Sequence, residues 1–286
     1  MEDVEKFALA AVIGWPIMHS RSPLMHNYWM KQQGINGTYV PLAIKPGAVP
    51  EALRSMPKLG FAGCNVTIPH KLVAKETMDE VDEAAEKMGA ISCVVVREDG
   101  SLFGTNNDWI GFLRNLEHSH PEFDLTGQDV TVIGAGGGAR AVCYGLIQAG
   151  VNGITMVNRT LANAETLQRL YGDIITVRPW EERSEALGGS ALVVNATCLG
   201  MVGMEGHDIS LDALDPDAVV YDIIYTPRET NLVKRAAERQ NRTCSGLGML
   251  LHQGPVAWKY WFGLEPEVTP ELYDLLADSL ESEYGK

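Results

Sequence analysis

The sequence of 286 residues is short of positive charge. Its 23 lysines and arginines stand against 37 aspartates and glutamates, which gives a formal net charge of −14. This charge disfavours nucleic acid and anionic membranes as partners, because both would repel the protein. The chain also lacks any apolar run near the roughly 20 residues of a membrane-spanning helix. We therefore expect a protein that binds neither nucleic acid nor a membrane, and that holds any anionic substrate by local donors.

Cysteine is scarce as well. The five cysteines are scattered and form neither a Cys-x-x-Cys motif nor a zinc-binding spacing with histidine. We expect buried free thiols and no metal site. The acidic start, Met1–Lys6, argues against a signal peptide and favours a cytoplasmic protein. With 45% hydrophobic residues, the chain can bury a core without disulfides, and its length suits two domains.

Apolar runs in the first third of the chain predict alternating strands and helices. Residues 8–14 form a short apolar run that ends in glycine, which is typical of a buried parallel strand. A turn at Glu98–Gly100 lies between two short apolar segments and predicts a hairpin. We expect strands over 8–14, 39–44 and 63–68, a hairpin over 93–96 and 101–104, and helices after Pro23 and over 47–56 and 72–88.

Later in the chain the alternation becomes more regular. Short runs rich in valine and isoleucine are each followed by a stretch of helical composition. This pattern predicts a doubly wound parallel sheet. We expect strands over 129–133, 154–157, 191–195 and 218–225, and helices over 139–149, 161–170, 229–240 and beyond Gly248.

A glycine-rich turn follows the predicted strand at 129–133. Its sequence, Gly134-Ala135-Gly136-Gly137-Gly138-Ala139, fits G-x-G-x-x-A between a strand and a helix. Gly134 allows a tight turn, Gly136 lets the backbone approach a pyrophosphate, and Ala139 permits close packing of the helix on the strand. Free N–H groups at the helix N-terminus attract phosphate. The turn predicts a dinucleotide site, and the alternative is an ordinary glycine-rich connection.

The end of the next strand indicates which dinucleotide binds. An NAD site usually has an acidic residue there for the ribose 2′-hydroxyl. This chain instead has Asn158-Arg159-Thr160, and the guanidinium of Arg159 suits a 2′-phosphate. We therefore predict NADP as the cofactor and keep NAD as the alternative. The competing interpretation of Arg159 is a surface arginine at the start of a helix.

Two polar motifs upstream of the glycine turn contain the candidate catalytic residues. Lys71 closes the motif over 65–71, just beyond a predicted strand, and Asp108 closes the motif over 104–108. Reduction of a ketone needs a proton for the developing alkoxide, and a lysine can supply it and take it back in reverse. Each residue alone is typical of an exposed charge or a cap. Together with a dinucleotide turn, they predict an acid–base pair in which Asp108 orients the site and accepts a substrate hydroxyl.

The segment after the first predicted strand offers two hydroxyls. Ser20 and Ser22 alternate directly before a helix, so both can face one anion. The alternative is that Ser22 only caps this helix, with Pro23 as its first residue. The residues alone leave both interpretations open.

We therefore expect an α/β protein of two domains. The first, residues 1–108, is an α/β domain for substrate binding and catalysis. The second, residues 109–246, is a Rossmann-type, doubly wound NADP-binding domain. The C-terminal helices over 247–286 are expected to return to the first domain.

These motifs in this order resemble the shikimate/quinate dehydrogenase family. The resemblance covers nearly the whole chain, at residues 14–27, 65–71, 104–108, 134–139, 158–160, 195–201, 222–227 and 246–253. It implies a cytoplasmic monomer or homodimer that reversibly reduces 3-dehydroshikimate to shikimate with NADPH, in the biosynthesis of aromatic amino acids.

The resemblance also implies roles for individual residues. Ser20 and Ser22 would bind the substrate carboxylate, and Lys71 and Asp108 would be the catalytic pair. Further contacts to the substrate would come from Asn65, Thr67, Ser92, Tyr225 and Gln253. Contacts to the cofactor would come from the glycine turn and from Asn158, Arg159, Thr160, Thr197 and Gly246.

Three departures from the family pattern put the substrate and the cofactor preference in question. Ser92-Cys93 stands where the family usually has Asn-Thr, and that asparagine is expected to contact the substrate. Asn107 replaces the usual threonine before Asp108, and Asn163 stands where many NADP-specific members have a second basic residue. A paralogue acting on quinate or an amino analogue is therefore the alternative function. A dinucleotide-sensing regulator without catalysis is a more distant one.

Overall fold

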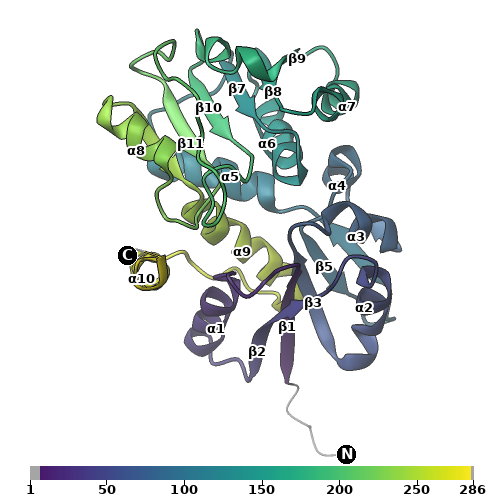
Figure 1. Ribbon diagram of the computed structural model, residues 1–286. Helices are drawn as coiled ribbons and strands as arrows, with labels where there is room; N and C mark the ends of the chain where they lie inside the picture. Colours follow the sequence, from purple (N-terminus) through teal and green to yellow (C-terminus); the bar gives the residue numbers. More distant parts are fainter. Residues whose placement is uncertain (1–6, 285–286) are drawn as a thin grey trace, which may run out of the picture. The chain divides into compact units, whose positions relative to one another are not determined.

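The computed structural model describes residues 7–284, so the acidic start of the chain lies outside the described residues (Figure 1). The chain forms two compact units. The first runs through Asn107 and takes in Gln253–Leu276, and the second comprises Asp108–His252 and the chain from Ala277 onward. Each unit contains its own α/β sheet, and part of the C-terminal helical segment belongs to the first unit. The predicted fold class is therefore confirmed.

The first unit is built on a mixed six-stranded sheet of order β2-β1-β3-β5-β6-β4. Strand β1 pairs in parallel with β2 and β3, and β5 runs antiparallel to both β3 and β6. The carboxyl ends of β1, β3 and β6 therefore meet at the edge where β5 begins. The strands are β1 (Ala8–Gly14), β2 (Gly37–Ala43), β3 (Phe61–Val66), β4 (Glu80–Val81), β5 (Cys93–Val96) and β6 (Leu102–Thr105).

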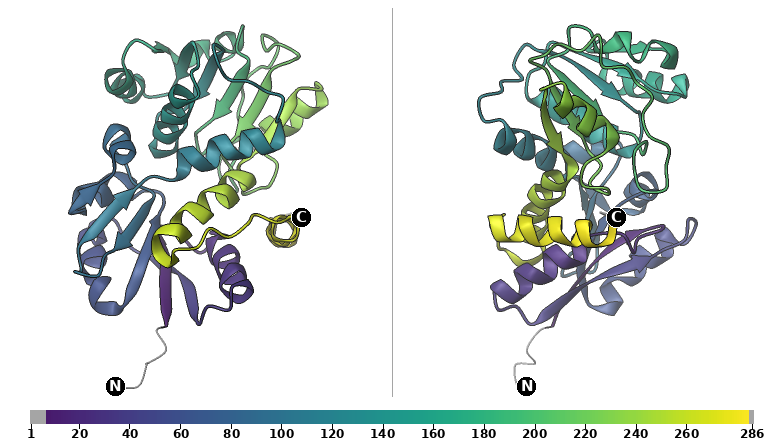
Figure 2. Two further views of the ribbon diagram at one scale, coloured as in Figure 1. Left: turned by 180° about the vertical axis from the view of Figure 1, so that it is seen from behind. Right: turned by 60° about the vertical axis from the view of Figure 1, so that its left-hand side comes forward.

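Helices cover both faces of this sheet (Figure 1 and Figure 2). On one face, Ala11 and Ile13 of β1 pack with Val49 and Leu53 of α2 and with Ala74 of α3. The other face is covered by α1 and by the part of α9 beyond Gln253. The helices of this unit are α1 (Ser22–Gln32), α2 (Val49–Ser55), α3 (Lys71–Thr77), α4 (Glu83–Met88), the end of α9 (Gly246–Phe262) and the start of α10 (Pro270–Tyr284).

The predicted hairpin is confirmed, but the single helix predicted over 72–88 is wrong. The hairpin turn closes through the N–H of Arg97, which donates to the carbonyl of Ser101 at 3.0 Å. Between α3 and α4, residues 80–81 instead form β4, which pairs with β6. The carboxylate of Asp82 then caps α4 by accepting from the N–H of Ala85 at 2.7 Å. A residue that caps a new helix interrupts the old one.

The second unit has a six-stranded, all-parallel sheet of order β12-β11-β10-β7-β8-β9. The chain starts in the middle with β7, winds outward to one edge and then to the other, which is the doubly wound order of dinucleotide-binding folds. The strands are β7 (Asp129–Ile133), β8 (Gly153–Val157), β9 (Ile175–Arg178), β10 (Leu192–Asn195), β11 (Val219–Asp222) and β12 (Arg242–Ser245).

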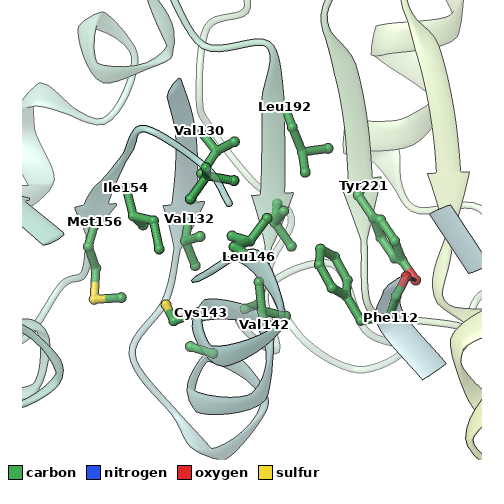
Figure 3. Packing of buried hydrophobic residues seen from close by; sticks show 14 of the residues in the cluster. Phe112, Val130, Val132, Val142, Cys143, Leu146, Ile154, Met156, Leu192 and Tyr221 are labelled. Atoms are coloured by element: carbon green, nitrogen blue, oxygen red, sulfur yellow. Dashed lines mark hydrogen bonds between the residues drawn. The ribbon is translucent and has the colours of Figure 1, made fainter. Parts of the chain in front are cut away.

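The core of the second unit lies between this sheet and its helices. Figure 3 shows Val142, Cys143 and Leu146 of α6 facing the apolar side chains of β7, β8 and β10. Phe112 of α5 packs on Tyr221 with ring centroids 4.8 Å apart. The helices are α5 (Asp108–Ser119), α6 (Gly137–Gln148), α7 (Leu161–Tyr171), α8 (Asn231–Glu238), the start of α9 and the end of α10.

The strand predicted over 218–225 ends earlier, at Asp222. The Asp222 carboxylate accepts from the backbone N–H of Ile224 at 3.0 Å, and this local bond turns the chain away from the sheet. Strands β9 and β12 and helix α5 were not predicted. The two strands are four residues each at the sheet edges and too short to give a clear pattern.

Candidate functional site

The carboxyl edge of the first sheet brings together segments that are far apart in the sequence. The N–H of Val66 donates to the carbonyl of Ser92 at 2.8 Å, and the N–H of Ser92 donates to the carbonyl of Thr105 at 3.0 Å. The N–H of Thr67 donates to the carbonyl of Ile13 at 3.0 Å. The segment over 65–71, Ser92 and the residues after β6 are therefore neighbours at one edge.

The side chain of Asn65 makes three hydrogen bonds at this edge. Its side chain is buried, and its Oδ1 accepts from the Tyr39 hydroxyl at 2.8 Å. Its Nδ2 donates to the carbonyl of Ser92 at 3.3 Å and to Oε1 of Gln253 at 3.4 Å. Three of the predicted substrate-binding residues, Asn65, Ser92 and Gln253, are thus in direct contact. Tyr39 was not among the predicted site residues.

Lys71 is the first residue of α3 and lies at the same edge. Its side chain is partly buried, and its carbonyl accepts from the N–H of Ile91 at 3.1 Å. The neighbouring His70 is buried, and its Nε2 lies 2.7 Å from the carbonyl of Ile44, to which it donates. The His70 ring therefore anchors the start of α3.

Asp108 is buried and is the first residue of α5, in the second unit. A carboxylate in the first turn of a helix is favoured by the helix dipole. The two predicted catalytic residues therefore stand in different units, and Asp108 directly follows the last residue of the first.

The structure of the segment with Ser20 and Ser22 contradicts the interpretation of Ser22 as a helix cap. Ser22 is the first residue of α1 rather than its cap, Pro23 is the second, and no side chain caps the helix. The N–H of Ser22 instead donates to Oγ of Ser20 at 3.2 Å. The interpretation that Ser22 only caps this helix is therefore wrong. Thr67 lies against the end of β1, because a Cβ on Gly14 would approach the Thr67 methyl to 2.7 Å.

Ser92 and Asn107, two of the departures from the family pattern, are in contact. The N–H of Asn107 donates to Oγ of Ser92 at 2.8 Å, and both residues are buried. The Ser92 hydroxyl therefore holds the chain directly before Asp108. Both polar atoms of the Asn107 side chain are buried without a hydrogen-bond partner.

The glycine turn in the second unit fits a dinucleotide pyrophosphate. Gly134 has φ +109°, and a Cβ there would lie 2.8 Å from the Thr197 methyl. At Gly136, the N-cap of α6, a Cβ would meet no atom within 4 Å, and no side chain caps the helix. Open space in front of uncapped N–H groups is what a phosphate needs. The residues present therefore fit this group.

Arg159 lies beside the glycine turn. The N–H of Gly134 donates to the carbonyl of Val157 at 2.8 Å, which places the end of β8 next to the turn. Nδ2 of Asn158 donates to the carbonyl of Thr160 at 2.7 Å, and Thr160 is the N-cap of α7. The Arg159 side chain between them is exposed. The loop thus presents a guanidinium where an NAD site usually has a carboxylate.

A buried polar network fixes the strand ends behind Thr197. The N–H and Oγ1 of Thr197 donate to Oδ1 of Asn195 at 3.0 and 2.7 Å, and Nδ2 of Asn195 donates to Oδ1 of Asp222 at 2.9 Å. The Thr230 hydroxyl donates to Oδ2 of Asp222 at 2.7 Å. Burial raises the pKa of Asp222 to about 6, against these bonds. Asn195 and Asp222 lie in segments that carry the family resemblance, but the sequence predicted no role for either residue.

Gly246 and Tyr225 lie near the ends of β11 and β12. A Cβ on Gly246 would approach the carbonyl oxygen of Ile223 to 2.1 Å, so backbone packing alone requires glycine here. Tyr225 follows β11 and is partly buried. Over residues 7–284, no group of three or more His, Cys, Asp and Glu side chains is arranged to hold a metal ion. In the same range, no helix combines the length and the apolarity needed to cross a membrane.

Replacing Asp222 with asparagine should remove one pH dependence of folding stability. Because the pKa of Asp222 is raised to about 6, the folded protein binds a proton here more tightly than the unfolded chain. The free energy of unfolding of the wild type should therefore rise relative to Asp222→Asn as the pH falls from about 6 to about 4, by at most about 2–3 kcal/mol. Urea unfolding of both proteins at several pH values measures this difference.

Asp208 provides a control of opposite sign. Its carboxylate is exposed, and a hydrogen bond from Arg183 lowers its pKa. Relative to Asp208→Asn, the wild type should lose stability as the pH falls. A difference between wild type and Asp222→Asn that stays constant with pH would contradict the raised pKa.

Comparison with known proteins places these features in a family. Residues 12–94 match the model described as the shikimate dehydrogenase substrate binding domain, and residues 116–229 match the one described as shikimate / quinate 5-dehydrogenase. The chain is 46% identical over 267 residues to a protein of Paramagnetospirillum magneticum named shikimate dehydrogenase (NADP(+)). The matched region covers 93% of this chain and 97% of that protein.

Two solved structures illustrate the range of this similarity. Shikimate 5-dehydrogenase from Thermus thermophilus, in complex with NADP(H) and shikimate, has a TM-score of 0.84 at 31% identity, covering 96% of this chain and 100% of that chain. Quinate dehydrogenase from Corynebacterium glutamicum, in complex with NAD, has a TM-score of 0.87 at 29% identity, covering 95% and 99%.

Proposed function

Because this chain belongs to the shikimate dehydrogenase family, we propose that it catalyses the reversible NADPH-dependent reduction of 3-dehydroshikimate to shikimate. The observation that supports this most is the carboxyl edge of the first sheet, where Asn65, Ser92 and Gln253 are in contact and Lys71 begins the next helix. Amides, hydroxyls and an ammonium suit a small ring that carries several hydroxyls and a ketone.

The cofactor would be held by the second unit. The N-terminus of α6 and the open space at Gly136 would accept the pyrophosphate, with Ala135, Gly137, Gly138 and Ala139 completing the turn. Arg159 would pair with the 2′-phosphate, between Asn158 and Thr160. Thr197 and Gly246 would line the same site. NADPH supplies the hydride when it is bound.

The substrate would be oriented by side chains from several of the matched motifs. The Ser20 and Ser22 hydroxyls would donate to its carboxylate, and Asn65, Thr67, Ser92 and Gln253 would bind its hydroxyls, with Tyr225 as a further contact. In reduction, the Lys71 ammonium gives one proton to the ketone oxygen as this becomes the alcohol, and the amine regains a proton from water. In oxidation, the neutral amine accepts the hydroxyl proton. Asp108 accepts a hydrogen bond from the substrate and keeps the proton donor oriented.

The division of labour follows the expected domains. We assign substrate binding and catalysis to residues 1–108 and NADP binding to 109–246. Of the helices over 247–286, we assign packing against the substrate domain to Gln253–Leu276, the part that belongs to the first unit. The net charge of −14 supports a protein without nucleic acid or membrane partners. We infer a cytoplasmic monomer or homodimer that serves the biosynthesis of aromatic amino acids.

A specialised dehydrogenase acting on quinate or an amino analogue is the second candidate. It is favoured by Ser92, which stands where the family usually has asparagine and whose hydroxyl is occupied by the N–H of Asn107. The similarity to a quinate dehydrogenase points the same way. A regulator without catalysis is a weaker candidate, because it would have no use for both Lys71 and Asp108.

Initial rates of the wild-type protein on shikimate, quinate and aminoshikimate, each with NADP+ and with NAD+, test the proposal. We expect the highest kcat/KM for shikimate with NADP+, because one basic residue at the 2′-phosphate and no acid at the ribose favour NADP. A higher kcat/KM for quinate or aminoshikimate would assign the specialised function. Binding of NADP+ without turnover of any of the three substrates would instead favour a dinucleotide-sensing regulator.

A further inference from the structure

His26 of α1 lies on the face of the first sheet that α1 and α9 cover, against Tyr39 of β2 and Trp258 of α9. Its side chain is fully buried in a cluster of aromatic rings. It stacks on Tyr39 with ring centroids 4.1 Å apart and planes 12° apart, and it meets Trp29 edge-on at 5.5 Å. This packing leaves the imidazole one position.

The ring nitrogens of His26 have fixed roles. Nε1 of Trp258 is 2.7 Å from Nδ1 of His26, and an indole nitrogen can only donate. Nδ1 is therefore the acceptor, and in the neutral ring the proton is on Nε2. Burial lowers the pKa of His26 to about 3, so the ring is neutral at any pH at which the protein works. Among the described residues, the buried Nε2 of His26 meets no hydrogen-bond partner, so the ring is held by Trp258 and by its aromatic neighbours.

The orientation of the Asn65 amide follows from its neighbours. The backbone carbonyl of Ser92 can only accept, so it must face the NH2 group of Asn65. The oxygen then faces the Tyr39 hydroxyl at 2.8 Å, which donates to it. The reverse orientation would set the Asn65 oxygen against the Ser92 carbonyl, and neither of these oxygens can donate.

The orientation of the Asn65 amide determines that of the Gln253 amide. The NH2 group of Asn65 needs an acceptor there, so Oε1 of Gln253 faces it at 3.4 Å. The Nε2 end of Gln253 then points away from Asn65. Trp258 therefore holds His26, His26 stacks on Tyr39, and the Tyr39 hydroxyl orients Asn65, which in turn contacts Gln253.

We propose that His26, Tyr39 and Trp258 are positioning residues that fix the amide orientations of Asn65 and Gln253 and so determine which hydroxyls of the substrate these amides can bind. This proposal rests on the proposed function, which assigns Asn65 and Gln253 to the substrate. The side chains of all three positioning residues are buried, and none is assigned a contact with the substrate. Their role is to make the site rigid before the substrate arrives, which lowers the entropy lost on binding.

Tyr39→Phe tests the proposal most cleanly, because it removes one hydroxyl and keeps the ring that stacks on His26. We expect KM for shikimate to rise by about 10-fold, the loss that one buried hydrogen bond implies. The KM for NADP+ should change by less than about twofold, since no cofactor contact is altered. An unchanged KM for shikimate, or equal rises for both ligands, would overturn the proposal.

Tyr221→Phe is the matched control. The Tyr221 hydroxyl is also buried and is 2.6 Å from Nδ2 of Asn115, but it lies in β11 of the second unit. This variant should lose a similar amount of Tm and keep the wild-type KM for shikimate. If Tyr221→Phe raised this KM as much as Tyr39→Phe, the effect would be one of general stability and the positioning role would fail.

A second measurement separates this proposal from the proposed function. Side-chain amide signals of Asn65 and Gln253, assigned by nitrogen-15 NMR of the full chain without substrate, report their hydrogen bonds directly. Tyr39→Phe should shift both pairs of signals, and Tyr221→Phe should shift neither. If both pairs stay in place in Tyr39→Phe, the positioning role is wrong. If the wild type does not turn over shikimate but the signals shift as expected, only the substrate assignment fails.

Discussion

Lys71→Ala should lower kcat for shikimate oxidation by about 10²- to 10⁴-fold, the usual contribution of a positioned general acid or base. The dissociation constant for NADPH should change little, because the cofactor residues lie in the second unit. Lys71 begins α3 beyond the end of β3, where the side chains proposed to bind the substrate are in contact. Without the amine, the proposed proton donor to the substrate oxygen is lost. Steady-state rates and NADPH fluorescence titrations measure the two quantities.

Lys75→Ala is the control for this variant. Lys75 lies in the last turn of the same helix and pairs with Glu86 at 2.8 Å. Lys75→Ala should keep kcat within about twofold, because this partly exposed ion pair has no assigned role in the site. Near-normal turnover of Lys71→Ala would remove the catalytic assignment of Lys71.

Arg159→Ala should raise KM for NADPH by about 10- to 100-fold, because it removes a charge-assisted hydrogen bond to the 2′-phosphate. The KM for NADH, which has no such phosphate, should stay within about twofold. The prediction rests on the exposure of Arg159 and on its place two residues after Val157, whose carbonyl accepts from the N–H of Gly134. Rates of 3-dehydroshikimate reduction at varied NADPH and NADH give both constants.

Arg169→Ala serves as the comparison for Arg159→Ala. Arg169 lies on α7, the helix that Arg159 precedes, and its Nη2 donates to Oγ1 of Thr166 on the helix surface. It should leave both KM values unchanged. Equal increases in KM for NADPH and NADH in Arg159→Ala would exclude a 2′-phosphate role.

Local sequence signals predicted much of the fold because they act between near neighbours. The turn at Glu98–Gly100 closes through Arg97 and Ser101, and the glycine turn lies between β7 and α6 as its pattern requires. The predictions of secondary structure were wrong where a partner distant in the sequence or one side-chain hydrogen bond determines the structure. Strand β4 exists because it pairs with β6, which comes later in the chain. Asp222 ends β11 through one bond to a backbone N–H.

The residues of the candidate site likewise differ in whether the sequence could predict them. The polar motif at the end of a strand singled out Asn65, and the family resemblance implied the roles of Gln253 and Thr197. The residues behind them could not be predicted, since the pairing of Tyr39 with Asn65 and of Asp222 with Asn195 depends on strand register. Ser92 illustrates a further limit. The sequence marked it as a departure, but only the structure revealed that its hydroxyl holds the N–H of Asn107.

The transfer of deuterium tests the central claim most directly. The wild-type protein is incubated with 3-dehydroshikimate and NADPH labelled with deuterium at the transferable nicotinamide position. The account predicts shikimate that carries one deuterium at the reduced carbon, seen by mass spectrometry and NMR, and much slower labelling with Lys71→Ala. Folded protein that binds NADPH and yields no labelled shikimate would contradict it.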